Sequence, residues 1–581
     1  MARRTWGLRA AGLVGVSALA LTACGGGSGE TTGGSGATPT KGGTLTMLSP
    51  LEKLQHLDPE LIYTGEDASF AQSWWQRQLV VYKVSNDPNQ AAELEGDLAT
   101  DTGTPNADGT QWVFNLRDGA TWEDGVPLTC DDIAYGISRQ YAVDVTGGGP
   151  KYMVDFLDVP KNSDGSSKYE GPYSGKGQEL FDAAVVCGDG NITFNLNAPS
   201  PDFPYALIWG TGPVPEARDT GKAYDKAPAT SGPYMIESAV TNEELVLVRN
   251  PNWDPASDPY RPAYPDSIVI KYGLAATEID QRLIEDAGDD KNAIGYGSLD
   301  PSVLATVFND PTYEARRLNE PDPYSIYYGI NTALVPNLLH RQAMMVALDR
   351  AQIKTNTGGD FAGDLADGTV KPNIGQDYAP TGLWETLLGQ PIPDSGDPEY
   401  AKQLIAESGE TPPVIRYQYR ESSTSSKLNA GVVKTSLEAA GFKVELESLP
   451  LGDYYTIIFD EKKAHEMMAL GWGADWPNAG TVLGPLFAGN GSWNLSRTDD
   501  PVYNEKFAAA QQNLNRDEQA TQWQELNAYS MQQGWAIPTL FENDQRLVGS
   551  NVYSASAPAG QNVYLWGAAG SFPYVDMYLK Q

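Results

Sequence analysis

Several stretches of the chain show a helical pattern, then a glycine, then a strand pattern. Residues 426–450 have helical spacing up to Gly441 and then alternate as a strand does. Residues 517–541 repeat the same helix-to-strand order. Because such units alternate along the chain, the sequence predicts an α/β fold built on mixed sheets.

Helix-end signals and hydrophobic spacing predict further elements. Asp397, Pro398 and Gly409 supply the cap, the first residue and the end of a helix over 397–409. Asn337 is a plausible cap for one helix over 340–353. Another helix is expected at 131–142, and strands are expected at 42–50, 110–116, 191–199, 243–253 and 266–272, the last two buried on both faces.

Length and charge limit the class of protein. The 581 residues exceed what a single hydrophobic core holds, so two or more lobes are expected. A hydrophobic content of 41% with 10% aromatic residues is typical of a globular protein. The formal net charge of −35 excludes a nucleic-acid binder on electrostatic grounds.

The first residues have the pattern of an export signal. Residues 1–23 combine Arg3, Arg4 and Arg9 with an apolar run too short to span a bilayer. The run ends in Leu-Thr-Ala-Cys, which resembles the lipobox of bacterial lipoproteins, so we expect Cys24 to be lipidated. Residues 24–42 would form a flexible tether on the outer face of the bacterial cytoplasmic membrane. The alternative is a general secretion signal with an incidental cysteine.

Two cysteines remain in the exported part of the chain. Cys130 and Cys187 favour a disulfide, because an even pair in an exported protein is usually bridged. Two free buried thiols are the alternative. His56, His340 and His465 lack ligand-like spacing with a cysteine, so we expect no metal site and no cofactor.

A single carboxylate stands out in the stretch LGWGADWPNAG at residues 470–480. Asp475 lies between glycines and two tryptophans, and the nearest cationic residues along the chain are Lys463 and Arg497. A buried carboxylate without a partner is costly. Asp475 is therefore either an ordinary turn residue or a group whose partner is not part of this chain.

Eight segments together resemble one known family. They occur in the order that is typical of the extracellular solute-binding proteins of family 5, which includes peptide- and nickel-binding components of ABC importers. The resemblance implies a two-lobed clamp, like that of periplasmic binding proteins, with a subdomain inserted in the first lobe. The segments are LEGDLAT (94–100), TQWVFNLRDGATWEDGVPLTCDDIAYGISR (110–139), ATSGPYMIES (229–238), LVRNPNWDP (247–255), HRQAMMVALDR (340–350), AKQLIAESG (401–409), LGWGADWPNAG (470–480) and WAIPTLF (535–541).

The resemblance also implies where the lobes begin and end. The chain would cross between the lobes near residues 320–323 and again near Gly534. The expected domains are lobe I at 43–81, 216–318 and 537–581, an inserted subdomain at 82–215 that contains both cysteines, and lobe II at 319–536.

In the peptide binders of this family the aspartate of the Gly-Trp-x-Ala-Asp segment receives the peptide's α-ammonium group, and Asp475 occupies that position. Trp472 and Trp476 would wall the first side-chain pocket, and the backbone of Gly473 and Ala474 would pair with an extended peptide. Other candidates are Tyr63 and Thr64 on the opposite lobe and Arg420 for the ligand's carboxylate.

The implied function is that of a substrate-binding lipoprotein. It would act as a monomer, capture short peptides and deliver them to the permease of an ABC importer. One alternative is the same fold binding another small solute, such as an oligosaccharide. A secreted glycoside hydrolase is a distant alternative, because acidic pairs such as Glu123-Asp124 are more often turn residues than catalytic groups. We therefore expect no enzyme activity.

Overall fold

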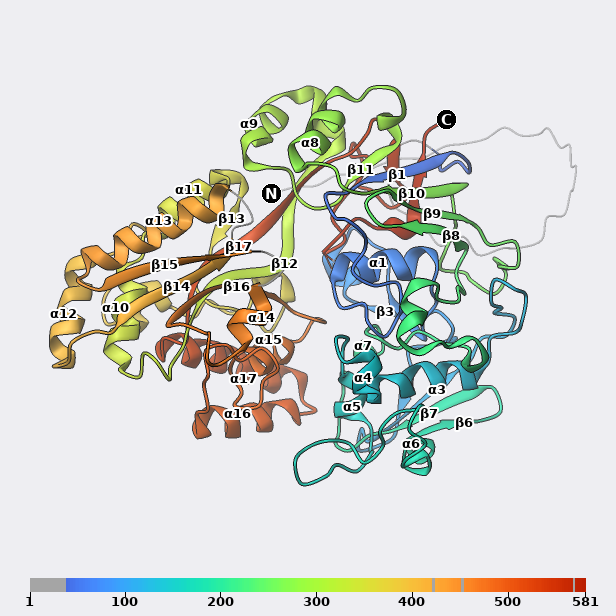
Figure 1. Cartoon of the computed structure of the whole chain (residues 1–581), viewed down its shortest axis with the longest axis horizontal. Coiled ribbons are helices and arrows are strands. Elements are labelled where there is room, and N and C mark those ends of the chain that lie inside the picture. The colour runs from blue at the N-terminus through green and yellow to red at the C-terminus, as the bar shows by residue number, and fades with distance from the viewer. Residues whose placement is uncertain (1–37, 421–423, 451–453, 568–569) are drawn as a thin grey trace, which may run out of the picture.

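The computed structural model describes residues 38–420, 424–450, 454–567 and 570–581. The chain forms two lobes connected by the long strands β12 (Arg317–Ile330) and β17 (Ala536–Leu547), which pair antiparallel (Figure 1). The predicted two-lobed α/β clamp with mixed sheets and an inserted subdomain is confirmed. None of the helices in the described ranges combines the length and apolar character that a membrane crossing requires.

The first lobe is built on a five-stranded mixed sheet. Its strand order is β11-β1-β10-β9-β8, with β1 parallel to both of its neighbours. Helices α1 (Gly65–Trp74), α8 (Ala276–Glu285) and α9 (Pro301–Asn309) belong to this lobe, as does the pair β18 (Val552–Ser554) and β19 (Met577–Leu579). The sheet strands are β11 (Ala293–Gly295), β1 (Thr44–Leu48), β10 (Ser267–Lys271), β9 (Glu244–Arg249) and β8 (Tyr234–Val240).

The expectation that 243–253 and 266–272 are buried on both faces is wrong. Along β9, Leu245 and Leu247 are buried while Val246 and Val248 are only half-buried. Strand β10 alternates in the same way. The two strands pair antiparallel, and an antiparallel sheet can leave one face partly open to water, where valine is tolerated.

The inserted subdomain holds a four-stranded sheet in the order β4-β5-β7-β6 and a separate β2–β3 pair. Trp112 and Phe114 of β5 face its core, as their alternation predicts. The strands are β2 (Val80–Tyr82), β3 (Leu94–Gly96), β4 (Thr104–Pro105), β5 (Gln111–Asn115), β6 (Val185–Cys187) and β7 (Asn191–Asn195), and the helices are α2 (Pro88–Ala91), α3 (Cys130–Ser138), α4 (Val143–Thr146), α5 (Tyr152–Phe156), α6 (Gln178–Ala184) and α7 (Phe203–Ala206).

The predicted disulfide is confirmed. Cys130 opens helix α3, Cys187 ends strand β6, and their Cα atoms lie 5.8 Å apart across the bridge. The bond therefore fastens helix α3 of the subdomain to the edge strand of its four-stranded sheet.

Replacing both Cys130 and Cys187 with alanine should destabilise the protein by about 4 kcal/mol, because the bridge closes a loop of 57 residues and restricts the unfolded chain. Chemical denaturation followed by fluorescence measures this loss. A reductant should reproduce it in the native protein and have no effect on the double variant. Equal stability of the two proteins under oxidising conditions would contradict the prediction.

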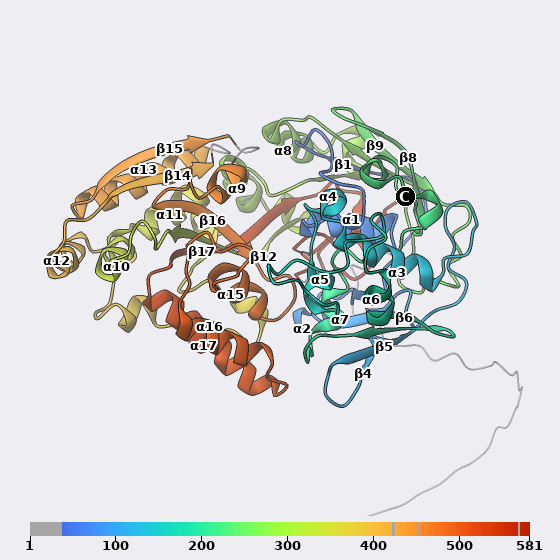
Figure 2. The same ribbon diagram turned by 60° about the horizontal axis from the view of Figure 1, so that its bottom comes forward.

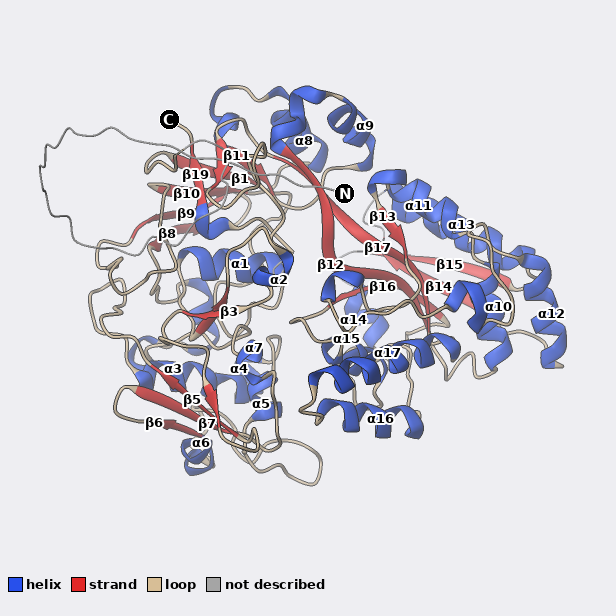
Figure 3. Ribbon diagram, turned by 180° about the vertical axis from the view of Figure 1, so that it is seen from behind, coloured by secondary structure: helices blue, strands red, loops and turns tan. Residues whose placement is uncertain are grey.

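The second lobe is built on a six-stranded sheet in the order β13-β17-β12-β16-β14-β15. Helices α11 and α13 lie along one side of this sheet, and α15 to α17 lie along the other (Figures 1 and 3). Besides β12 and β17, its elements are β13 (Gly363–Leu365), β14 (Val414–Arg420), β15 (Lys443–Leu449) and β16 (Met467–Gly473), with α10 (Leu338–Ala347), α11 (Arg350–Thr357), α12 (Pro398–Ser408), α13 (Thr424–Ala439), α14 (Tyr454–Phe459), α15 (Gly480–Phe487), α16 (Pro501–Gln511) and α17 (Arg516–Gln532).

Most helix-end signals of this lobe work as predicted. The Asp397 side chain accepts a hydrogen bond from the Tyr400 backbone N–H, and Gly409 ends α12 in the left-handed conformation at φ 67°. Asn337 caps α10, as expected. The single helix predicted over 340–353 is wrong, however, because Leu348 is extended and Asp349 caps a second helix, α11.

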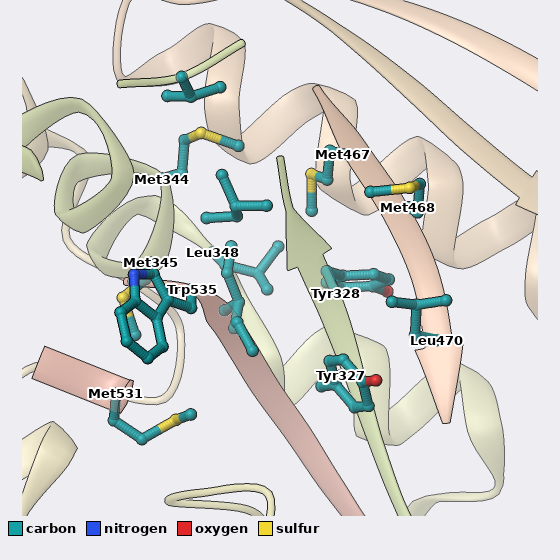
Figure 4. Close-up of a cluster of buried hydrophobic side chains, with 14 of the residues drawn as sticks. Tyr327, Tyr328, Met344, Met345, Leu348, Met467, Met468, Leu470, Met531 and Trp535 are labelled. Atoms are coloured by element: carbon teal, nitrogen blue, oxygen red, sulfur yellow. The ribbon is translucent and has the colours of Figure 1, made fainter. Parts of the chain in front are cut away.

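The core of lobe II supports the strand that leads to Asp475. Residues of β12, β16, α10 and α17 pack together in one cluster (Figure 4). The buried methionines fill the space between the tyrosine rings and the helices, as a flexible side chain does in an irregular core. The cluster includes Tyr327, Tyr328, Met344, Met345, Leu348, Met467, Met468, Leu470, Met531 and Trp535.

The connection between the lobes is a strand pair. Strand β12 continues through the predicted crossing at 320–323, with an irregular register between Pro321 and Ser325. Strand β17 begins just after Gly534, pairs within the sheet of lobe II, and then reaches Asp544 opposite Glu320. The domain boundaries given by the resemblance stay a proposal.

Candidate functional site

Asp475 lies at the meeting point of the two lobes and the inserted subdomain. It follows strand β16, and its backbone N–H donates to Thr481 Oγ1 at 3.2 Å. From across the cleft, Trp209 Nε1 donates to the Asp475 backbone carbonyl at 2.9 Å. The loop is therefore held from both sides, which fixes the direction of the carboxylate.

Two tyrosine hydroxyls donate to the same oxygen of Asp475. The Tyr152 hydroxyl forms a very short hydrogen bond to Oδ2, and the Tyr63 hydroxyl reaches Oδ2 at 3.3 Å. Oδ1 receives no hydrogen bond from any described residue, and no described Lys, Arg or His comes within 4.0 Å of the carboxylate. Asp475 thus has polar contacts but no cationic partner in the described part of the chain.

A cavity of about 220 Å³ borders Asp475, and we call it the aromatic pocket. Its lining comes from the loop before α1, from α1 itself, from the inserted subdomain, from β12, β16 and α14 of lobe II, and from segments after α15 and β18. Eight of its eighteen described lining residues are tyrosine or tryptophan, so rings form much of the walls. The lining residues are Tyr63, Gly65, Ala68, Ser69, Gln72, Tyr82, Ile208, Trp209, Pro323, Tyr324, Tyr455, Gly471, Trp472, Gly473, Ala474, Asp475, Trp493 and Trp566.

The sequence-predicted residues divide into two groups. Tyr63, Trp472, Gly473 and Ala474 line the aromatic pocket together with Asp475. The Trp472 indole is fixed by a hydrogen bond from Nε1 to the Thr481 carbonyl at 2.9 Å, and a side chain at Gly473 would lie 3.1 Å from the Tyr324 ring.

Three candidates lie elsewhere. Trp476 does not line this pocket, because its ring packs edge-on against Tyr152 at 4.9 Å in the inserted subdomain. Thr64 is exposed at the start of α1 and lines none of the cavities described here. Arg420 lies behind the wall, with its guanidinium 5.8 Å from the centre of the Tyr455 ring.

Two larger cavities adjoin this site. One of about 790 Å³ lies between the inserted subdomain and helices α15 to α17, which face each other in Figure 2. Its described lining residues include Asp155, Asp202, Asp499 and several amides, and none of them is Lys, Arg or His. The other, of about 330 Å³, lies behind Ala474 and Trp476. The cleft therefore has room for a ligand longer than the aromatic pocket alone.

The family of bacterial extracellular solute-binding proteins, family 5, matches residues 93–494. The chain belongs to this family. The matched range covers most of the inserted subdomain and extends through β16 and the Asp475 loop.

Individual relatives of this family 5 protein are distant but cover most of its length. The periplasmic oligopeptide-binding protein OppA of Salmonella typhimurium is 25% identical over 507 residues, which is 80% of this chain and 84% of the relative. The solved structure of clavulanic acid biosynthesis oligopeptide binding protein 2 has a TM-score of 0.80 at 27% identity, covering 93% of this chain and 96% of that chain. The murein tripeptide binding protein MppA of Escherichia coli shares the fold, with a TM-score of 0.71 at 19% identity over 93% of this chain and 98% of that one.

Sequence reasoning missed several residues that shape the site of this family 5 protein. Tyr152, Trp209, Tyr455 and Trp493 come from four separate segments and meet only in the folded chain. A tryptophan in Ile-Trp-Gly at 208–210 is a weak signal, because an isolated aromatic residue is more often part of the core.

Burial in the cleft raises the pKa of Asp475 to about 7, although the hydrogen bonds from Tyr152 and Tyr63 oppose this rise. Burial also raises the pKa of both tyrosines, which keeps their hydroxyls protonated as donors. The empty site therefore holds its negative charge weakly. A cation that enters the pocket would favour the ionised carboxylate and take up its free oxygen, Oδ1.

Changing Asp475 to asparagine should stabilise the ligand-free protein, increasingly so at higher pH. The folded pKa of about 7 exceeds the unfolded value of about 3.9, so the native carboxyl favours folding only while it is protonated. The variant's advantage should be absent near pH 4, grow between pH 4 and 7, and be complete above about pH 7. Thermal unfolding at three pH values tests this, and a constant difference between the proteins would contradict it.

Proposed function

We propose that the protein captures short peptides in the cleft between its lobes and that Asp475 receives their α-ammonium group. The observation that carries this proposal is that Oδ1 of Asp475 accepts no hydrogen bond from a described residue and borders a cavity with no cation among its described lining residues. An ammonium donor would satisfy this oxygen in a site of low polarity, where such pairing is strong. The oligopeptide-binding relatives support the choice of ligand.

The backbone of β16 supports an extended ligand. Strand β14 pairs with β16 only at Met467 and Met468, so within the described residues Gly471 and Gly473 have a strand partner only on the β12 side. A peptide could add to this edge through main-chain hydrogen bonds, which give affinity without reading side chains. In this proposal Gly473 and Ala474 keep their predicted role as backbone partners of the peptide. Trp472 and Tyr63 keep the role of wall residues of the pocket.

The remaining candidates keep weaker roles. Trp476 would affect ligand binding indirectly, because its ring contacts the ring of Tyr152 and so helps to position it. Arg420 would need to move past Tyr455 to meet a ligand carboxylate, and Thr64 would serve at the rim of the cleft. Their roles stay predictions.

We further propose that the protein acts as a monomeric, non-catalytic component of an ABC importer and passes its ligand to the permease. It would work outside the cytoplasm, as the description of its family indicates. Cys24 would be its lipid anchor to the outer face of the cytoplasmic membrane; this residue lies outside the described part of the chain.

Changing Cys24 to alanine should release the protein into the medium or leave an uncut precursor. The reason is that the thiol would carry the lipid and the signal peptidase of lipoproteins requires it. Fractionation of cells followed by immunoblotting measures both outcomes. A variant that stays processed and bound to the membrane would contradict lipidation at this residue.

The proposed function is tested by identifying what the protein carries. Protein purified without denaturation should release short peptides on unfolding, and mass spectrometry should identify them. Binding of the same peptides, measured by calorimetry without turnover, would support capture rather than catalysis. Recovery of an uncharged oligosaccharide would favour the alternative solute, and hydrolysis of the added ligand would favour an enzyme.

A further inference from the structure

The walls of the aromatic pocket are made of rings that hold one another in place. On the side of lobe II, the Trp493 ring lies 5.0 Å from Trp472, 5.1 Å from Tyr455 and 4.9 Å from Phe459. Trp493 therefore packs against Trp472, which belongs to the core strand β16. This wall is pre-organised, because none of its rings can turn without displacing another.

The facing wall is built in the same way. The Tyr63 ring meets Trp209 edge-on at 5.5 Å, and Tyr82 meets Trp566 edge-on at 6.4 Å. Tyr82 and Trp566 are almost fully buried, so their positions depend on the core of the inserted subdomain. Two sets of rings in mutual contact thus enclose the space in front of Asp475.

Charge among the described lining residues of the pocket is limited to one group. Asp475 is their only ionisable acid or base apart from the tyrosine hydroxyls. The amide of Gln72 and the hydroxyl of Ser69 are engaged within the protein, since Gln72 Nε2 donates to the Ile208 carbonyl at 3.3 Å and Ser571 Oγ donates to Ser69 Oγ at 2.9 Å. Once an ammonium occupies Asp475, none of the described lining residues offers a charged group to a second ligand charge.

The side chain of a peptide's first residue is attached to the carbon next to the α-ammonium. If that ammonium contacts Oδ1 of Asp475, this side chain enters the cavity that Asp475 borders. We propose, on the basis of the function proposed above, that the aromatic pocket selects peptides whose first residue is bulky and uncharged, such as phenylalanine or leucine. Trp493 is the residue that sets this preference.

Physical chemistry gives the direction of the selectivity. A large apolar side chain gains the free energy of burial among rings, and an aromatic one also gains ring contacts. Glycine leaves the space to water and gains neither. A charged first side chain would lose its hydration without a partner in the lining.

Calorimetry with tripeptides X-Ala-Ala tests the proposal on the native protein, with phenylalanine, leucine, glycine, lysine and aspartate as X. Phenylalanine and leucine should bind about 10- to 100-fold more tightly than glycine. Lysine and aspartate should bind no more tightly than glycine. Similar affinities for all five peptides, or a charged first residue that binds as tightly as phenylalanine, would overturn the proposal.

Variants of Trp493 test its role in the selectivity. Trp493→Ala should reduce the phenylalanine-to-glycine ratio of affinities to below about fivefold, because the ring that a bulky first side chain would contact is removed from the wall. Trp493→Phe should keep most of the preference. An unchanged ratio in the alanine variant would refute the role of Trp493.

The two proposals fail in different ways. If all five peptides bind equally but lose affinity on N-acetylation, the proposed function stands and the selectivity is refuted. If no peptide binds, or if N-acetylation has no effect, peptide capture at Asp475 is itself wrong and the selectivity falls with it.

Discussion

Replacing Asp475 with alanine should weaken the binding of peptides with a free amino terminus by about 30-fold to several thousand-fold. The substitution would leave the ligand's ammonium buried in the closed cleft without its carboxylate partner. Removing one member of such a buried charge pair typically costs about 2–5 kcal/mol. The loss should appear mainly in the dissociation rate, since the ammonium contact forms after the peptide has entered the cleft.

Calorimetry with one peptide in free and N-acetylated form measures this effect. The native protein should lose affinity on acetylation, and the Asp475→Ala variant should bind both forms with similar weakness. Asp144→Ala, which removes an exposed carboxylate from α4, is the matched control and should bind as the native protein does. Equal affinity of the native protein for both peptide forms would contradict the prediction and would indicate that Asp475 is an ordinary turn residue.

The sequence allowed Asp475 to be found because its surroundings are local. A single segment shows two tryptophans, three glycines and no nearby cation along the chain. The resemblance to the family motif implies that this segment faces the cleft. Tyr152 could not be found in this way, because its segment carries no motif and its hydroxyl reaches Asp475 only through the fold. Trp493 likewise becomes informative only in the folded chain, where its ring packs against Trp472.

The predictions of secondary structure also succeeded where the signal was local and failed where the outcome depended on other parts of the chain. Asp397, Pro398 and Gly409 act on their own helix, so their prediction succeeded. The stretch over 340–353 kept helical spacing across Leu348, and the competing cap at Asp349 was overlooked. Burial of β9 on one face only depends on what the sheet packs against, which a run of valines and leucines does not reveal.

A buried ion network joins the inserted subdomain to lobe I, and Asp97 is at its centre. Its Oδ1 accepts a hydrogen bond from Arg77 Nε at 2.8 Å, and its Oδ2 accepts one from Arg261 Nη2 at 2.8 Å. The backbone N–H of Gln78 also donates to Oδ2, at 2.9 Å. The side chains of Asp97, Arg77 and Arg261 are at most 1% exposed, so water cannot replace a lost partner.

Changing Asp97 to alanine should therefore destabilise the protein by about 3–5 kcal/mol, because Arg77 and Arg261 would stay buried with Asp258 as their only carboxylate within 4.0 Å among the described residues. The two arginines hold the pKa of Asp97 at about 2 despite its burial, below the unfolded value of about 3.9. Its contribution is thus present above about pH 4 and is lost as the pH falls towards 2. Urea denaturation at neutral pH measures the effect.

Glu170→Ala, which breaks an exposed pair with Lys176, is the control and should cost less than about 1 kcal/mol. A loss as small as that of the control would contradict the prediction, because it would mean that water or Asp258 compensates the two buried arginines for the lost carboxylate.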